Sequence, residues 1–151
     1  MIREELVFVL NDIKTQDECI KFLADKANED NLLSDEGEYV KAIYHRESEF
    51  STAVGYDVAI PHGMSDAVKE AFICFAKLEN PIKWGPDEKE VKMVFMIGVP
   101  EHLKNKIHLK LISQISKALI DEDFRNGLLA CNTAKEAFNY LDKINQGIKE
   151  A

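Results

Sequence analysis

Two apolar segments, AFICFAKL at residues 71–78 and VKMVFMIGV at residues 91–99, decide the fold of this chain. Both are rich in residue types that favour β-strands, and neither shows the alternation of apolar and polar residues expected when one face of a strand meets water. They therefore predict two strands that are covered on both faces. Cys74 lies inside the first segment and is expected to pack as a small buried apolar side chain.

Segments with helical spacing lie on both sides of these strands. Thr15–Glu18 forms a capping box, in which a hydroxyl and a carboxylate bind free backbone donors, and it opens a first helix. A second helix is expected from near Ser34, and helical spacing returns from about Lys104. Asp121–Asp123 favours the start of a short helix, and Thr133–Glu136 is a second capping box that opens the last one.

Helices at both ends of the chain with strands in the middle indicate an α/β fold. We expect a single domain, residues 1–151, in which a mixed β-sheet is sandwiched between α-helices, since no repeat or linker interrupts the chain. Between the two main strands, NPIKWGPD at residues 80–87 indicates a turn-rich connection. Trp84 in this connection either contacts a partner or, as the simpler interpretation, covers the core beneath it.

The composition excludes several classes of protein. The formal net charge of −8 argues against binding to nucleic acid or to an anionic membrane surface, both of which attract Lys and Arg. The N-terminal segment is too short and too acidic for a signal peptide, and no apolar stretch is long enough to span a membrane, so we expect a cytoplasmic protein. The cysteines form no CxxC pair and predict neither a zinc site nor a disulfide framework (Cys19, Cys74 and Cys131).

His62 is the leading candidate for a chemically active residue. No phosphate-binding loop of the GxxxxGK[ST] or GxGxxG type is present. His62 comes after the strand-like residues 58–60 and Pro61, at the end of a strand, where open α/β sheets place their ligands. Imidazole is an available nucleophile near neutral pH. Pro61 fixes the backbone before it, and Gly63 after it lets another chain approach. From these residues alone, a surface histidine in a turn remains the simpler interpretation.

A longer pattern around His62 resembles a known family. Glu47 and, after six residues, VGYDVAIPHG at residues 54–63 resemble the active-site signature of the enzyme IIA component, fructose/mannitol type (EIIA type 2), of the phosphoenolpyruvate-dependent sugar phosphotransferase system (PTS). Arg46 stands where that family has an arginine before the signature. The resemblance extends from about residue 5 to residue 145, including LENPIKW at 78–84, HLKLIS at 108–113 and FRNGLL at 124–129.

The resemblance implies a function and a role for each site residue. His62 would be the phosphorylated nucleophile, His108 a second histidine that holds the phosphoryl oxygens, and Arg46 a polar group that orients the site. The chain would be a phosphotransferase component that accepts phosphate from the phosphocarrier protein HPr. It would pass the phosphate to a cysteine of enzyme IIB, which serves the membrane enzyme IIC in sugar uptake. Fructose is the expected sugar, and mannitol and galactitol stay open. No metal or cofactor is implied.

Other interpretations of these residues stay open at this point. His108 lies on a helix with apolar spacing, where a half-buried structural histidine is common, and Arg46 ends a charged stretch that is typical of a solvated helix face. Glu47 and Glu49 are two residues apart and point in different directions on a helix, which argues against a hydrolase pair. A regulatory, nitrogen-related enzyme IIA that signals by its phosphorylation state is the alternative function.

The two remaining histidines, His45 and His102, are expected on the surface without a role. His102 and His108 are separated by six residues, and no carboxylate or cysteine pattern completes a metal shell around them. We therefore expect no metal site.

Overall fold

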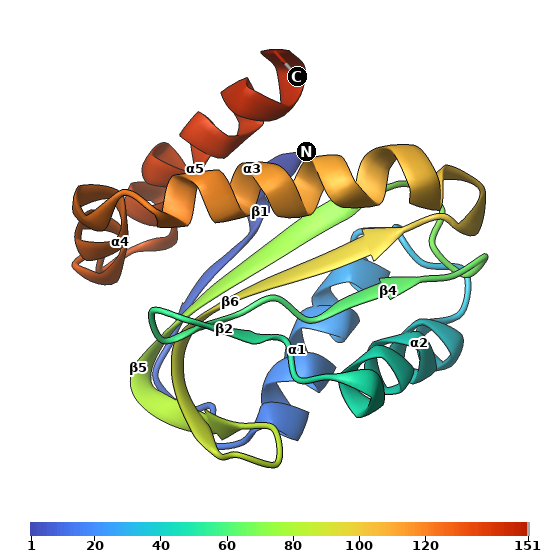
Figure 1. Cartoon of the computed structure of the whole chain (residues 1–151), viewed down its shortest axis with the longest axis horizontal. Helices are drawn as coiled ribbons and strands as arrows, with labels where there is room; N and C mark the ends of the chain where they lie inside the picture. Colours follow the sequence, from blue (N-terminus) through green and yellow to red (C-terminus); the bar gives the residue numbers. More distant parts are fainter. Residues whose placement is uncertain (151) are drawn as a thin grey trace.

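The protein is a six-stranded mixed sheet with helices on both faces (Figure 1), which confirms the predicted α/β sandwich. The computed structural model describes residues 1–150, apart from the side chains of Lys104 and Asn105; Ala151, the last residue of the expected domain, lies outside the described residues. The strand order is β1-β5-β6-β3-β2, and β4 pairs with β6 further along the edge that β3 also uses.

The elements have the following bounds. The strands are β1 Ile2–Leu10, β2 Ala53–Gly55, β3 Val58–Ala59, β4 His62–Met64, β5 Phe72–Trp84 and β6 Lys89–Val99. The helices are α1 Gln16–Glu29, α2 Glu36–Glu49, α3 Leu109–Leu119, α4 Glu122–Leu129 and α5 Ala134–Glu150. A 3₁₀ turn, η1 (Glu101–Leu103), and a π-helical turn, η2 (Lys104–His108), lead into α3.

The hairpin of β5 and β6 forms the centre of the sheet and supplies side chains to both hydrophobic layers. Phe75 and Phe95 face the layer of α3, α4 and α5, with their ring centroids 4.9 Å apart. Cys74 and Met96 face the opposite layer, which α1 and α2 cover. Successive residues of a strand point to opposite faces, so a strand that is buried on both sides must be apolar throughout. The unalternating sequence of both strands is thereby explained.

Four of the predicted helix starts are confirmed by capping hydrogen bonds. In each of the four helices, a side-chain oxygen just before the first turn accepts a backbone N–H that the helix itself cannot satisfy. The capping residues are Thr15 for α1, Asp35 for α2, Asp121 for α4 and Thr133 for α5. The helix expected from about Lys104 instead begins with the π-helical turn η2, and α3 starts only at Leu109, without a side-chain cap.

The expectation of a helix at each end of the chain is wrong at the N-terminus. The chain begins with strand β1, which pairs in parallel with β5 at the edge of the sheet. Asn145 of α5 holds its first residue, because its side-chain amide donates to the carbonyl of Ile2 and its oxygen accepts the Ile2 N–H. The start of β1 and helix α5 therefore lie side by side, as Figure 1 shows.

The connection between the two central strands is shorter than expected at residues 80–87. Strand β5 continues to Trp84, so only residues 85–88 form the turn, and the pairing register shifts in the part of β5 that contains Pro81. Proline has no N–H for the ladder, so it is tolerated in a strand where the pairing is irregular. Trp84 has an exposed fraction of 0%. This burial confirms that it belongs to the core.

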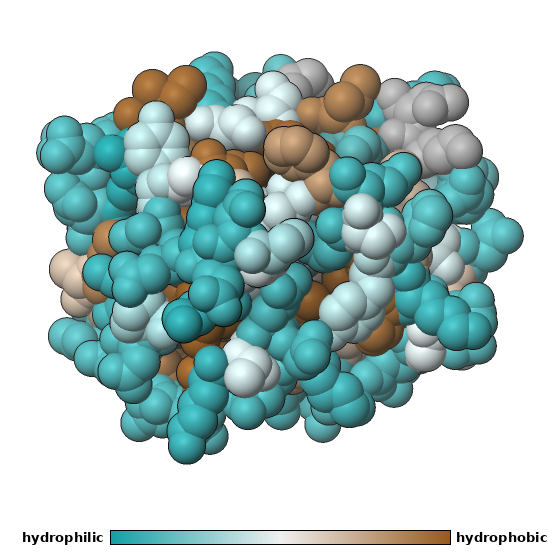
Figure 2. Space-filling view, turned by 60° about the horizontal axis from the view of Figure 1, so that its bottom comes forward, coloured by the Kyte–Doolittle hydropathy of each residue, from teal (hydrophilic) through white to brown (hydrophobic). Residues whose placement is uncertain are grey.

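The outer surface agrees with the charged composition. The face shown in Figure 2 is mainly hydrophilic, with apolar side chains in small separate groups. Within residues 1–150, the helices are all too short or too polar to cross a membrane.

Candidate functional site

The backbone around His62 is fixed by hydrogen bonds on both sides. Strand β3 ends at Ala59, and His62 begins β4, where it lies opposite Ile97 of β6. Between the two strands, the Ile60 N–H donates to the carbonyl of Thr52 (3.0 Å), and the Pro61 carbonyl accepts the Ile97 N–H (2.9 Å). His62 thus follows a strand as predicted, but it also starts the next one. The interpretation as a surface histidine in a turn is wrong, because His62 is only 6% exposed.

The imidazole of His62 is held in one orientation by its own backbone. Its Nδ1 atom lies 2.7 Å from the carbonyl oxygen of Ile60. A carbonyl can only accept a hydrogen bond, so Nδ1 carries the proton and Nε2 keeps its lone pair. Burial is the main cause of a lowered pKa for His62, and His108 and Arg46 lower it further, whereas the Ile60 carbonyl and Glu47 act in the opposite direction. The ring is therefore neutral near pH 7, with Nε2 as the nucleophilic nitrogen.

Gly63 was expected to let another chain approach, but it packs against helix α2 instead. A Cβ atom at this position would lie 3.1 Å from Cβ of Ala42 and 3.3 Å from the backbone nitrogen of Ile43, both on α2. The residue is buried. Gly63 therefore lets helix α2 approach strand β4 closely, and it does not leave space for another chain. This close packing sets the position of α2, which carries Arg46.

His108 lies beside His62, although the two are far apart in sequence. The ring centroids are 4.9 Å apart and the ring planes are inclined by 48°. His108 is the last residue of the π-helical turn η2, and such turns are frequent at functional sites. Its Nδ1 atom is buried without a hydrogen-bond partner among the described residues, an unusual arrangement that favours a ligand-binding role. Burial, and then Arg46, lower the pKa of His108.

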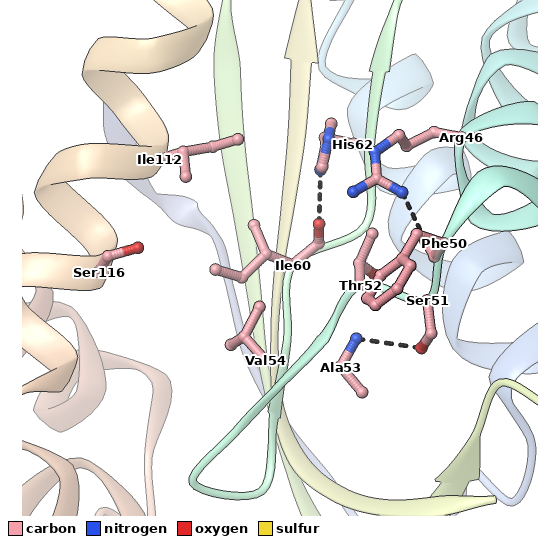
Figure 3. Close-up of a pocket in the computed structure, with 10 residues that line it drawn as sticks. All are labelled: Arg46, Phe50, Ser51, Thr52, Ala53, Val54, Ile60, His62, Ile112 and Ser116. Atoms are coloured by element: carbon pink, nitrogen blue, oxygen red, sulfur yellow. Dashed lines mark hydrogen bonds between the residues drawn. The ribbon is translucent and has the colours of Figure 1, made fainter. Parts of the chain in front are cut away.

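Arg46 completes the group from the C-terminal end of α2. It is half-buried, and its guanidinium donates a hydrogen bond to the carbonyl of Phe50 while lying beside the His62 ring (Figure 3). A pocket of about 450 Å³ opens next to both residues, and α3 forms its opposite wall. Its lining residues are Arg46, Phe50, Ser51, Thr52, Ala53, Val54, Ile60, His62, Ile112 and Ser116. Arg46 and His62 also line a smaller hollow of about 150 Å³.

The structure thus brings together the three predicted site residues His62, His108 and Arg46. It combines one neutral nucleophilic nitrogen with a second neutral imidazole and a guanidinium, and a guanidinium suits the oxygens of a phosphoryl group. Within residues 1–150, no group of three or more His, Cys, Asp or Glu side chains is placed to hold a metal ion. His45 and His102 are exposed, which confirms that they are surface residues.

One residue near the site had no role predicted from sequence. The carboxylate of Glu47 accepts hydrogen bonds from the backbone and hydroxyl of Thr52 and from the indole N–H of Trp84. Its place at the start of the signature was the only sequence signal for it. Glu49 is exposed, and so the two carboxylates do not form a catalytic pair.

The comparisons with known proteins identify the family of this chain. The family model of the phosphoenolpyruvate-dependent sugar phosphotransferase system, EIIA 2, matches residues 1–144. The chain therefore belongs to the type 2 enzyme IIA family of that system. The fructose-specific EIIA component of Haloferax volcanii is 31% identical over 141 residues, which cover 93% of this chain and 91% of that protein.

Other relatives are much longer or are similar mainly in fold. Multiphosphoryl transfer protein 2 of Escherichia coli is 27% identical over 89% of this chain, but the match spans only 16% of its length. The nitrogen regulatory protein IIA-Ntr of Neisseria meningitidis has a TM-score of 0.80 at 25% identity, covering 93% of this chain and 95% of that one. The mannitol enzyme IIA of Escherichia coli, solved in complex with its phosphorylated enzyme IIB, has a TM-score of 0.77 at 21% identity, covering 97% and 99%.

Proposed function

We propose that this chain carries a phosphoryl group on Nε2 of His62, which it accepts from phosphorylated HPr and passes to a cysteine of an enzyme IIB. The observation that carries the proposal is the hydrogen bond from Nδ1 of His62 to the Ile60 carbonyl. It fixes the tautomer, and with it the nitrogen that can attack. The family match over residues 1–144 supports a transferase role in the sugar phosphotransferase system.

The transfer is a pair of in-line displacements at phosphorus. In the first, the lone pair of Nε2 forms a new N–P bond as the N–P bond to the donor histidine breaks, and the electron pair of that bond stays with the donor ring. The His62 ring then bears positive charge, which the Ile60 carbonyl stabilises through the Nδ1–H group. In the second, a cysteine thiolate attacks phosphorus, the N–P bond breaks, and its electron pair returns to Nε2.

Arg46 and His108 act on the phosphoryl group in flight. Its charge is spread over the equatorial oxygens, so a fixed donor or cation near them lowers the barrier. Arg46 supplies the cation beside His62, and it is held in place by its hydrogen bond to the Phe50 carbonyl. His108, 4.9 Å from His62 between ring centroids, supplies a second ring that donates to a phosphoryl oxygen.

The partners and the sugar follow from relatives rather than from this chain's own geometry. Enzyme IIB as acceptor is supported by the shared fold with the mannitol enzyme IIA, which forms a complex with phosphorylated enzyme IIB. Fructose-type uptake, through a membrane enzyme IIC, is supported by the 31% identity to the fructose-specific component of Haloferax volcanii. The transfer would take place in the cytoplasm.

A regulatory role of the nitrogen-related type is not favoured. The nitrogen regulatory protein shares the fold, but its identity of 25% is lower than the 31% shared with the fructose-specific component. Incubation of the phosphorylated chain with an enzyme IIB and its sugar separates the two roles. Formation of a sugar phosphate supports transport, and a phosphorylated chain that passes its group to no enzyme IIB supports regulation.

The test of the carrier role is phosphorylation in a reconstituted system. Incubation with labelled phosphoenolpyruvate, enzyme I and HPr is expected to place an acid-labile, base-stable label on the wild-type chain and none on the His62→Ala variant. His45→Ala is the matched control, because His45 is an exposed histidine on the same hollow as His62. Labelling that persists in His62→Ala would overturn the proposal. His108→Ala should still accept label, but should pass it on more slowly.

A further inference from the structure

We infer that Glu47 is a positioning residue for phosphoryl transfer, which holds the His62 imidazole through a continuous series of hydrogen bonds. This inference rests on the proposed function of His62. Glu47 is not among the residues that line the pocket, but it binds one of them, Thr52, and it lies at the end of α2 beside Arg46. Its effect passes through Thr52 and Ile60.

The first link in the series is the Glu47 carboxylate itself. Its oxygens lie 2.7 and 3.0 Å from the Thr52 hydroxyl and 3.1 and 3.3 Å from the Thr52 backbone nitrogen. The indole nitrogen of Trp84 donates to the same carboxylate over 2.9 Å. Trp84 is fully buried at the end of β5, and Thr52 is 2% exposed. The carboxylate is therefore anchored on the core and fixes one residue of the loop after α2.

The next links lead from Thr52 to the reacting ring. The carbonyl of Thr52 accepts the Ile60 N–H over 3.0 Å, and the carbonyl of Ile60 accepts the Nδ1–H of His62 over 2.7 Å. Both backbone polar groups of Ile60 are thus hydrogen-bonded, its N–H to Thr52 and its carbonyl to His62. If Thr52 moves, the Ile60 carbonyl is free to turn, and the bond that selects the Nδ1–H tautomer weakens. Hydrogen bonds to a charged carboxylate are the strong ones, so Glu47 is the anchor of the series.

Charge gives Glu47 a second effect on the same ring. The groups around His62 are Arg46 and Glu47 on α2 and His108 at the end of η2. The smaller hollow is also lined by His45, Glu49 and Glu101. Among these, the Glu47 carboxylate raises the pKa of His62 and opposes the lowering by burial, His108 and Arg46. It therefore stabilises the positive charge that the ring bears while it holds the phosphoryl group.

The simplest alternative is that Glu47 only stabilises the fold, by tying the end of α2 to the β5–β6 hairpin. A purely structural role predicts a loss of stability with no change in the His62 tautomer or in its pKa. The tautomer and the pKa are measured directly by the ¹⁵N chemical shifts of the imidazole as pH is varied. This measurement needs no partner protein, so it tests the inference even if the proposed function fails.

The experiment compares Glu47→Gln with Glu49→Gln in the intact chain. Both variants remove one negative charge from the same turn of α2, but Glu49 is exposed and does not contact Thr52 or Trp84. For Glu47→Gln we expect a smaller Nδ1–H fraction of His62, a lower His62 pKa, and phosphorylation by HPr slowed roughly tenfold to a hundredfold, as for other small misplacements of a reacting group. Glu49→Gln should match wild type.

A second pair of variants covers the case in which Glu47→Gln does not fold. Thr52→Val preserves the shape of the side chain and the backbone link but removes the hydroxyl link to Glu47, and Thr52→Ser restores it. Thr52→Val should change the His62 tautomer in the same direction, and Thr52→Ser should return it toward wild type. A folded Glu47→Gln or Thr52→Val variant whose His62 tautomer and pKa equal those of wild type would overturn the inference. Absence of labelling in wild type would instead refute the carrier role alone.

Discussion

Replacing Gly63 by alanine tests how closely the site depends on the packing of α2 against β4. The added Cβ would lie 3.1 Å from Cβ of Ala42, 3.2 Å from Cε1 of Tyr39 and 3.3 Å from the backbone nitrogen of Ile43. Tyr39 and Ile43 are fully buried and cannot turn aside. Helix α2 must therefore move away from the sheet by a few tenths of an ångström.

The expected loss of stability follows from two opposing effects. Overpacking a well-packed core costs about 1–3 kcal/mol. Replacing glycine by alanine lowers the conformational entropy of the unfolded chain, and this offsets about 0.4–1 kcal/mol of the cost. We expect Gly63→Ala to lower the free energy of unfolding by about 1–2 kcal/mol, which for a chain of this length lowers Tm by about 2–8 °C. Because α2 carries Arg46, we also expect slower phosphorylation of His62.

Gly37→Ala is the matched control on the same helix. Its Cβ would meet only an oxygen of Asp35, at an ordinary contact distance of 3.4 Å. Since alanine is favoured over glycine in a helix, Gly37→Ala should raise the free energy of unfolding by about 0.5–1 kcal/mol. Urea unfolding of both variants measures the difference. A Gly63→Ala protein as stable as Gly37→Ala would refute the claim that close packing of α2 on β4 fixes the site.

Two further predictions concern groups around the same site. The pKa values of His62 and His108 are lower in the folded protein than in the unfolded chain. As pH falls through about 6.5, the unfolded chain therefore binds more protons than the folded protein. The free energy of unfolding should decrease when pH is lowered from about 7.5 to about 5.5. Urea unfolding should show a smaller fall for His62→Gln, and an equal fall would contradict the burial of a neutral ring. Tyr39 donates a 2.8 Å hydrogen bond to the carbonyl of Ile97, the residue opposite His62. Tyr39→Phe should cost about 0.5–1.5 kcal/mol in the same assay, and an unchanged midpoint would contradict a net contribution from this bond.

Much of the fold could be predicted because local chemistry and tertiary packing agree in it. The two central strands are apolar on both faces, and the capping residues Thr15, Asp121 and Thr133 mark helix starts that do not depend on distant contacts. Strand β1 could not be predicted in the same way. Its pairing with β5, more than 60 residues away along the chain, is a tertiary contact that decides its conformation.

The residues of the site could be predicted, but their hydrogen bonds could not. Resemblance to a family singled out His62, His108 and Arg46, and the structure places them together. The tautomer of His62 could not be predicted, because it depends on where the Ile60 carbonyl points after β3 ends. The hydrogen bonds of Glu47 to Thr52 and Trp84 join residues up to 37 positions apart, so no local pattern reveals them.

The position of the phosphoryl group on the imidazole tests the carrier role of His62 most directly. After phosphorylation by HPr, long-range ¹H–¹⁵N and ³¹P NMR spectra distinguish a phosphate on Nε2 from one on Nδ1, and His62 from His108. Because the Ile60 carbonyl holds the proton on Nδ1, we expect the phosphate on Nε2 of His62. A phosphate on Nδ1 of His62, or on His108, would contradict the assignment.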